Sequence, residues 1–337
     1  MTPSPKGRLP IDTYVQGILD QNKVILSKAI TVSESTLLSD RHLSREILKK
    51  LLPHTGNSFR IGITGIPGVG KSTFIDTFGE FLTKQSLRVA VLAIDPSSTY
   101  SQGSILGDKT RMHRLARNPM AYVRPSPTAG SLGGVSRRTR EALLLCEAAG
   151  YEMILIETVG VGQSEVAVHH MVDAFLLLAI PHTGDELQGI KRGIMEMADI
   201  IFMNKAENEL LASARKSKAQ LSQALRLYPP KESGWKTKLV IGSALHQLGI
   251  DQLWDRLCEL KARSQKNGYW NNNRQQQALT WMLDHIRSEL ESRFLEKDLV
   301  ARRFPLLKQG VLDQEISPIQ AAEELLALWQ SESGTTP

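Results

Sequence analysis

Short apolar runs rich in β-branched residues alternate with longer helical patterns through the middle of the chain. Such runs predict buried strands, and they cover residues 60–64, 89–94, 153–156, 174–180, 200–203 and 239–241. A short run at 122–123 is a further candidate. Strands that are apolar throughout and separated by helices form parallel sheets covered on both faces. The pattern therefore predicts an α/β domain whose ligands bind at the carboxyl edge of the sheet.

Both ends of the chain carry helical patterns instead. Apolar residues recur at helical spacing from about residue 11 to 52, and Pro53 and Gly56 end this pattern. After polar residues 265–273, two amphipathic stretches follow at 275–293 and 318–329, the second preceded by Ser317 as a candidate N-cap. We therefore expect three parts, which are an N-terminal helical extension (1–56), the α/β domain (57–264) and a C-terminal helical arm (265–337).

A phosphate-binding loop is predicted between the first strand and the helix after it. The motif G-x-x-x-x-G-K-S lies in a segment that reads Gly65, Ile66, Pro67, Gly68, Val69, Gly70, Lys71, Ser72, Thr73. Glycines let backbone N–H groups surround a β-phosphate, Lys71 reaches the β- and γ-oxygens, and the Ser72 hydroxyl ligates Mg²⁺. The strand before the motif and the helix after it support this interpretation, so we predict a P-loop that binds a nucleoside triphosphate.

Acidic residues at strand ends are candidates for the magnesium site. Asp95 follows the strand at 89–94 and Glu157 follows the strand at 153–156, so both are expected at the edge that carries the loop. Mg²⁺ prefers hard oxygen ligands, which these carboxylates and Ser72 would supply. Asp108 is a third candidate, although nothing in the sequence fixes its distance from the loop. Asp95 and Glu157, with Lys71, are also the candidates for the hydrolytic chemistry.

Two segments are predicted to select the base. After the strand at 200–203 come Asn204, Lys205, Ala206 and Glu207, similar to the N-K-x-D element by which GTPases recognise guanine. The carboxylate of that element accepts hydrogen bonds from guanine that adenine does not offer. Glu207 retains this chemistry with one extra methylene, so we expect guanine preference with altered affinity. The second segment fits the S-A-x loop that lies behind the guanine ring, and it reads Ser243, Ala244, Leu245.

Two glycine-containing polar segments, 157–165 and 184–191, stand where compact loops are usual. The first reads as a switch loop whose Gly160 N–H meets the γ-phosphate and moves after hydrolysis. Gln163 is a candidate for orienting the attacking water. In the best-known GTPases, however, the catalytic glutamine follows the switch glycine directly.

Composition limits the partners and the compartment. The 41 Lys and Arg residues exceed the 35 Asp and Glu residues and give a net charge of +6, but they are scattered and not interleaved with aromatics. We therefore expect no nucleic-acid partner. No stretch is long and apolar enough to cross a membrane, and Cys146 and Cys258 do not suggest a disulfide framework. These features favour a protein of the cytoplasm with no membrane partner.

Blocks outside the P-loop resemble one family. They are 95–98, 103–112, 132–134, 157–165 and 184–191, and they resemble signature sequences of the ArgK/MeaB family of GTPases associated with methylmalonyl-CoA mutase. The resemblance implies a G domain of the SIMIBI branch that hydrolyses GTP to GDP and phosphate. It also implies a homodimer formed through the C-terminal arm, and Mg²⁺ surrounded by Ser72, Asp95, Asp108 and Glu157. Glu207 departs from the family pattern.

The resemblance also implies a role. Members of the family are chaperones that use GTP to gate delivery of adenosylcobalamin to the acyl-CoA mutase and to protect that enzyme. In the family pattern, 95–112 is switch I and 184–191 is a third switch that communicates with the mutase. Cobalamin itself is not a predicted cofactor, because the sequence lacks the D-x-H-x-x-G pattern of cobalamin-binding modules.

Two alternatives stay open at the level of sequence. One is a P-loop kinase or ATPase linked to amino-acid transport, which needs an acceptor pocket with a base. The other is a metal-insertion GTPase, which needs a Cys/His cluster near the switches. His169 and His170 are poor candidates for that cluster, because adjacent residues of a helix point to different faces.

Overall fold

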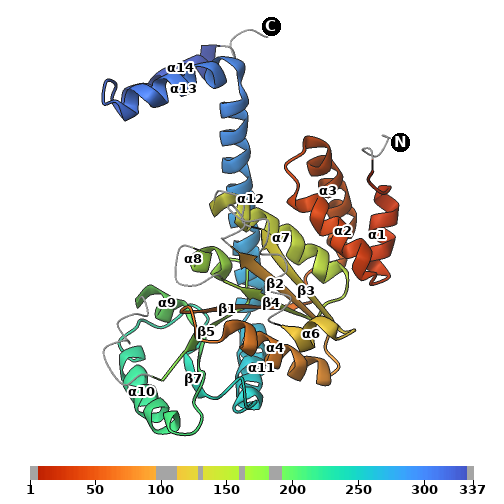
Figure 1. Ribbon diagram of the computed structural model, residues 1–337, viewed down its shortest axis with the longest axis vertical. Coiled ribbons are helices and arrows are strands. Elements are labelled where there is room, and N and C mark those ends of the chain that lie inside the picture. Colours follow the sequence, from red (N-terminus) through yellow and green to blue (C-terminus); the bar gives the residue numbers. More distant parts are fainter. Residues whose placement is uncertain (1–6, 96–111, 128–131, 159–163, 182–191, 332–337) are drawn as a thin grey trace. The chain divides into compact units, whose positions relative to one another are not determined.

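The computed structural model describes residues 7–95, 112–127, 132–158, 164–181 and 192–331. They form a seven-stranded sheet in which all neighbouring strands are parallel, in the order β3-β2-β4-β1-β5-β6-β7 (Figure 1). The strands are β1 (Phe59–Gly65), β2 (Val89–Asp95), β3 (Ala121–Pro127), β4 (Met153–Glu157), β5 (Ala174–Ala179), β6 (Ile200–Met203) and β7 (Lys238–Ile241). Each overlaps one of the predicted runs, which confirms the α/β domain with a parallel sheet.

Helices cover both faces of this sheet. On one face, α4 (Lys71–Lys84), α6 (His113–Arg117) and α11 (Ile250–Lys266) share a hydrophobic core with the strands. On the other lie α7 (Leu132–Ala148) and α8 (Ser164–His169). Strand β1 serves both layers, because Ile61 and Ile63 belong to the first core whereas Gly62 meets Val168 of α8. Two further helices are α9 (Arg192–Met197) and α10 (Leu210–Leu225).

The predicted N-terminal extension consists of α1 (Ile11–Leu19), α2 (Lys23–Glu34) and α3 (Leu38–Leu51), followed by a 3₁₀ turn at Leu52–His54. These helices pack on one another and on α7 (Figure 1). Polar contacts fix them to the sheet, since Arg124 of β3 forms an ion pair with Glu34, and Lys23 Nζ donates to the Ala121 carbonyl at 2.6 Å. The extension is therefore joined to the α/β domain by packing and by charge.

At the other end of the chain come α12 (Tyr269–Glu296), α13 (Asp298–Leu312) and α14 (Pro318–Ser331). The predicted N-cap of the last helix is confirmed, because Ser317 Oγ accepts a hydrogen bond from the Gln320 N–H at 3.2 Å. Helix α13 was not predicted. Pro305 lies inside it, and a proline normally interrupts a helical pattern.

By its internal contacts the chain divides into two compact units, 1–277 and 278–337. The division falls inside α12, whose first turns pack on the α/β domain. The second unit has a small core of its own, formed by Val300, Leu307, Ala321 and Leu325.

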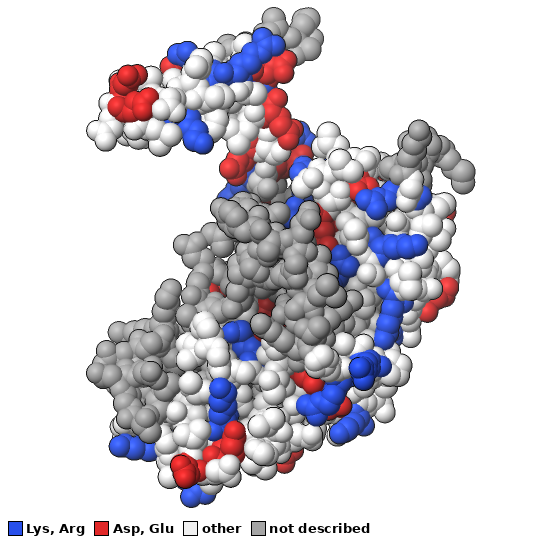
Figure 2. All heavy atoms as spheres, viewed as in Figure 1, with Lys and Arg blue, Asp and Glu red and all other residues white. Residues whose placement is uncertain are grey.

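The described surface shows no single field of charge on the face drawn in Figure 2. There, Lys and Arg side chains form separate groups with Asp and Glu between them. Among the described residues, no helix combines the length and the apolar character that crossing a membrane requires.

Candidate nucleotide-binding site

The predicted phosphate loop lies at the junction of β1 and α4, at the carboxyl edge of the sheet. Gly70 precedes the helix with φ 91°, a left-handed conformation that side chains rarely adopt. Close approach also requires Gly65, because a Cβ atom there would come within 2.7 Å of the Leu178 carbonyl oxygen. The loop therefore has the backbone that a phosphate cradle needs, and it leads directly into the N-terminus of α4, the end of a helix that favours anions.

Lys71 is the first residue of α4 and reaches back over the loop. Its Nζ donates a hydrogen bond to the Gly65 carbonyl oxygen at 2.9 Å. Burial lowers the pKa of Lys71, and the nearby carboxylates of Glu157 and Glu165 oppose that shift. The cation is thus held at the loop by the Gly65 carbonyl and lies within the electrostatic influence of two acids.

Two of the predicted metal ligands end adjacent strands. Asp95 ends β2 and Glu157 ends β4, and these strands pair directly. The end of β4 is fixed to β1 by Thr158, whose N–H donates to the Ile63 carbonyl at 2.9 Å and whose hydroxyl donates to that of Thr64 at 2.9 Å. Glu157 is buried beside the loop. Asp108 and Gln163 lie outside the described residues.

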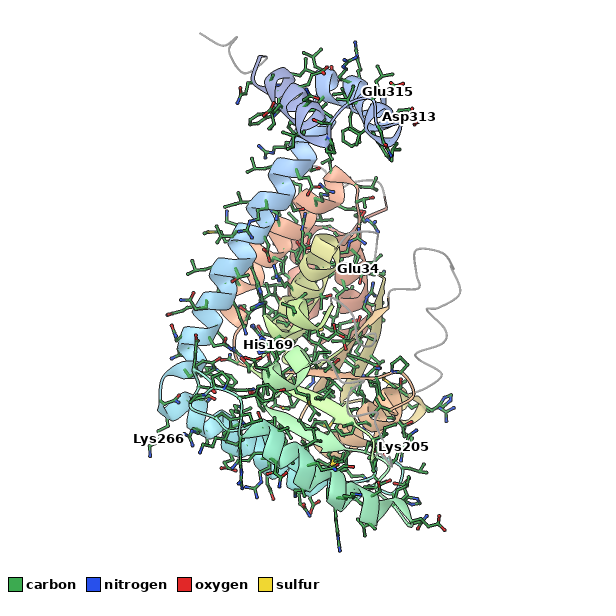
Figure 3. All side chains as sticks on the ribbon, turned by 90° about the vertical axis from the view of Figure 1, so that its left-hand side faces the viewer. Glu34, His169, Lys205, Lys266, Asp313 and Glu315 are labelled. Atoms are coloured by element: carbon green, nitrogen blue, oxygen red, sulfur yellow. The ribbon has the colours of Figure 1, made fainter. Side chains whose placement is uncertain are left out.

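The predicted base-selecting segments meet the phosphate loop through Asn204. Its Nδ2 donates to the Val69 carbonyl at 2.9 Å, and its Oδ1 accepts from the Ala244 N–H at 2.8 Å. Lys205 Nζ donates to the Gly68 carbonyl at 2.7 Å. One buried amide therefore connects β6, the phosphate loop and the 243–245 loop, and Lys205, labelled in Figure 3, lies at this edge of the sheet.

The loop at 243–245 is itself well fixed. Ser243 and Leu248 exchange two backbone hydrogen bonds of 3.0 Å, and the Thr77 hydroxyl of α4 donates to the Ala244 carbonyl at 2.9 Å. Ala244 is buried, whereas the side chain of Leu245 is exposed. The predicted Ser-Ala-x segment thus presents a rigid backbone and an exposed apolar side chain.

Glu207 lies three residues after Asn204 in the chain. Its Oε2 is buried, and none of the described residues donates a hydrogen bond to it. A buried carboxylate oxygen in that condition is costly unless a donor arrives from elsewhere. The side chain therefore offers a hydrogen-bond acceptor in the segment that is predicted to select the base.

Glu165 has no role predicted from the sequence, although it lies in the segment that resembles a switch. The residue is 1% exposed and stands in the first turn of α8. An acidic residue at the start of a helix is usually a solvated partner of the helix dipole. Its burial depends on how α8 packs, which the local sequence does not show.

A glycine-rich loop between a strand and a helix, at the carboxyl edge of a parallel sheet, defines the class of P-loop nucleotide-binding proteins. Comparison with known proteins gives the family. Residues 26–298 match the family described as "Methylmalonyl Co-A mutase-associated GTPase MeaB".

Individual relatives agree with this match. A mouse protein named "Methylmalonic aciduria type A homolog, mitochondrial" is 43% identical over 338 residues, which cover 97% of this chain and 81% of that protein. "GTPase ArgK" of Escherichia coli is 40% identical over 310 residues, covering 92% and 94%. A crystal structure of a protein called "LAO/AO transport system kinase" has 33% identity and a TM-score of 0.74, covering 95% and 97%.

The chain belongs to the MeaB family of GTPases associated with methylmalonyl-CoA mutase. The predicted family and the predicted GTPase activity are thereby confirmed. The family name also accounts for the nucleotide site, since GTP is what such a protein binds and hydrolyses.

Proposed function

We propose that this GTPase depends on Mg²⁺ and acts as a chaperone for an adenosylcobalamin-dependent methylmalonyl-CoA mutase, gating cofactor delivery and protecting the enzyme. The observation that carries the nucleotide part is the hydrogen-bond network of Asn204, which joins the phosphate loop to both base-selecting segments. The family description and the name of the mouse relative support the choice of partner.

The donor set beside the loop fits magnesium. Ser72 in the first turn of α4 offers a hydroxyl, and Glu157 at the end of β4 offers a buried carboxylate. Asp95 ends the adjacent strand, and Asp108 remains a proposed fourth member of the group. Hard oxygen donors of this kind, completed by phosphate oxygens and water, suit Mg²⁺. When bound, the metal would neutralise charge on the β- and γ-phosphates.

Guanine would be selected by Glu207 and the 243–245 loop. The buried Oε2 of Glu207 would accept hydrogen bonds from the guanine N1–H and 2-amino groups. Lys205 and Asn204 hold the base-selecting segment against the phosphate loop, so base and phosphates would be read by one connected unit.

Hydrolysis would follow from in-line attack of water on the γ-phosphate. The loop N–H groups and Lys71 would stabilise the charge that develops on the phosphate oxygens. Gln163 is the proposed group that orients the water, and the loops after β4 and β5 would report the nucleotide state to the mutase. Because no established catalytic glutamine follows Gly160 directly, we expect slow turnover without the partner.

The C-terminal arm is the proposed dimer contact. Five apolar residues of α12 are exposed and recur at the spacing of one helix face, namely Leu279, Met282, Leu283, Ile286 and Leu290. An apolar stripe of this length in water favours association. A second copy of the same helix is the partner that the family resemblance implies, so we propose a homodimer of cytoplasmic location with neither nucleic acid nor membrane as partner.

A direct binding comparison tests the nucleotide part of the proposal. Purified protein is titrated with fluorescent GTP and ATP analogues in the presence of Mg²⁺. We expect GTP to bind at least about tenfold more tightly, which is the effect of one or two hydrogen bonds to a buried carboxylate. Equal affinities would contradict guanine selection.

A kinase is the alternative function to test, because one of the similar crystal structures is of a protein called "LAO/AO transport system kinase". It predicts transfer of the γ-phosphate to an acceptor, whereas a GTPase releases free phosphate. Radiolabelled GTP distinguishes the two. The metal-insertion alternative needs a cluster of ligands, and within the described parts of the chain no three His, Cys, Asp or Glu side chains form such a group.

A further inference from the structure

Glu165 is a buried acid to which neither the family resemblance nor the proposed mechanism gives a task. It is 1% exposed, at the start of α8. The carboxylate also acts on the P-loop lysine, since Glu165 and Glu157 both raise the pKa of Lys71 against the lowering by burial.

The packing of α8 places Glu165 at the phosphate edge independently of that electrostatic effect. Helix α8 connects the end of β4 with the start of β5, and both strands run parallel to β1. The helix must therefore run antiparallel to β1. Val168 lies against Gly62 in the middle of β1, where an added Cβ atom would come within 2.9 Å of Val168 Cγ1.

Glu165 precedes Val168 by three residues and so lies on the same face of α8, one turn closer to the carboxyl end of β1. Gly65 and the Nζ of Lys71 are at that end. The carboxyl end of β1 is thus flanked by a cation from α4 and a carboxylate from α8.

We propose that Glu165 is a positioning residue that competes with nucleotide phosphates for Lys71, and so sets how fast nucleotide leaves the loop. The proposal rests on the P-loop site described above. Lys71 has three N–H donors, which phosphate oxygens and carboxylates both attract. A buried negative charge repels bound phosphates and favours their release, since charges act strongly where water is excluded.

The test is the rate at which fluorescent GDP is released into excess unlabelled GDP, measured by stopped flow on the full chain. Glu165→Gln keeps the shape of the side chain and removes its charge. We expect release to slow roughly tenfold and affinity for GDP to rise, as expected for loss of one partly screened charge at short range. The slowing should be larger without Mg²⁺, because the metal neutralises part of the phosphate charge.

Two controls separate this effect from damage to the fold. Glu165→Asp keeps the charge but withdraws it by one methylene, and should release GDP at a rate between those of the wild type and Glu165→Gln. Glu196→Gln removes an exposed charge from α9 and should leave release unchanged. A purely structural role predicts weaker binding for Glu165→Gln, the opposite sign.

Unchanged or faster release of GDP from Glu165→Gln would overturn the proposal. The proposed nucleotide site would still stand in that case if the wild-type protein binds GTP. Should Glu165→Gln unfold, as judged by circular dichroism, Glu165→Asp gives the answer through its longer distance to Lys71. Slower release than wild type supports the proposal, and unchanged or faster release contradicts it.

Discussion

At the scale of single residues, the proposed selection of guanine depends most on Glu207, where the predicted base-selecting segment has glutamate in place of aspartate. Its buried Oε2 accepts no hydrogen bond from the described residues. A buried polar atom in this condition is expected where a ligand supplies the missing donor. The extra methylene therefore does not carry the carboxylate out to solvent. Selectivity for guanine is expected to survive the change.

Replacing this acid tests that claim. Glu207→Ala should lower affinity for GTP by roughly ten- to a hundredfold, the effect of losing hydrogen bonds to a charged group, and leave affinity for ATP nearly unchanged. Isothermal titration with both nucleotides measures the two changes. Glu209→Ala, at an exposed position just before α10, is the matched control. A parallel loss of GTP and ATP binding would show that Glu207 is structural.

Lys71 gives the second residue-scale prediction. Lys71→Ala removes the cation above the phosphate loop and should lower the rate of GTP hydrolysis at least about a hundredfold, because the charge on the transferring phosphate loses its nearest side-chain partner. Phosphate release at saturating GTP measures it. Exposed Lys84, at the other end of the same helix, supplies a control in which Lys84→Ala should hydrolyse GTP normally. Substantial hydrolysis by Lys71→Ala would contradict the site.

The convergence of the proposed site segments at one edge of the sheet could be predicted from the sequence, for a physical reason. The phosphate loop and the base-selecting segment each follow a strand, and strand ends at one edge of a parallel sheet must converge. The link through Asn204 could not be predicted, because it joins Val69 and Ala244 across long stretches of sequence. The burial of Glu165 could not be predicted either, because it depends on packing between segments that are distant in the sequence.

At the scale of elements, the first turns of α12 are clamped to the amino edge of the sheet. Arg274 forms two hydrogen bonds with Asp173, of 2.8 and 2.7 Å, donates to the Ser58 carbonyl at 2.5 Å and stacks on Trp270. Asp173, which leads into β5, is 2% exposed. A pair buried to this degree fixes where the helix begins.

This clamp predicts a stability loss. Arg274→Ala leaves the carboxylate of Asp173 buried without its guanidinium and should lower the free energy of unfolding by about 3 kcal/mol or more. Urea denaturation followed by circular dichroism measures the change. Arg287→Ala, on the same helix but in an exposed pair, should change it by less than about 0.5 kcal/mol. Equal effects of the two substitutions would contradict the clamp.

Strands and helices could be predicted where the hydrophobic pattern of the sequence agrees with the burial of the residues in the fold. The buried strands show as apolar runs because both faces of the sheet are covered. Helix α13 escaped prediction because Pro305 interrupts its pattern, and the polar residues 271–273 were placed before the predicted helix although they lie inside α12. Polar residues continue that helix because its first turns are anchored by Arg274 and by Gln277, whose amide donates to the Val172 carbonyl at 2.7 Å.

At the scale of the whole molecule, the two compact units suggest a division of labour. The unit 1–277 contains the nucleotide site, and the unit 278–337 carries most of the exposed apolar face of the arm. Under the proposed function, nucleotide chemistry and association would lie in separate parts of the chain.

Charging the apolar face tests its role in association. The double substitution of Leu283→Glu and Ile286→Glu should convert a dimer to a monomer, since two buried charges oppose an apolar contact. Analytical ultracentrifugation measures the mass of the wild-type protein and of the variant in solution. Glu291→Gln, on the same helix, should leave the mass unchanged. A wild-type monomer at micromolar concentration would contradict the dimer.

The central claim is that a mutase partner and this GTPase act on each other. It is tested most directly by measuring GTP hydrolysis with and without a purified adenosylcobalamin-dependent methylmalonyl-CoA mutase, with Lys71→Ala as the control for contaminating activity. We expect hydrolysis by the wild-type protein to accelerate severalfold and to saturate as mutase is added, while the control stays inactive. Hydrolysis that is the same at every mutase concentration would contradict the claim.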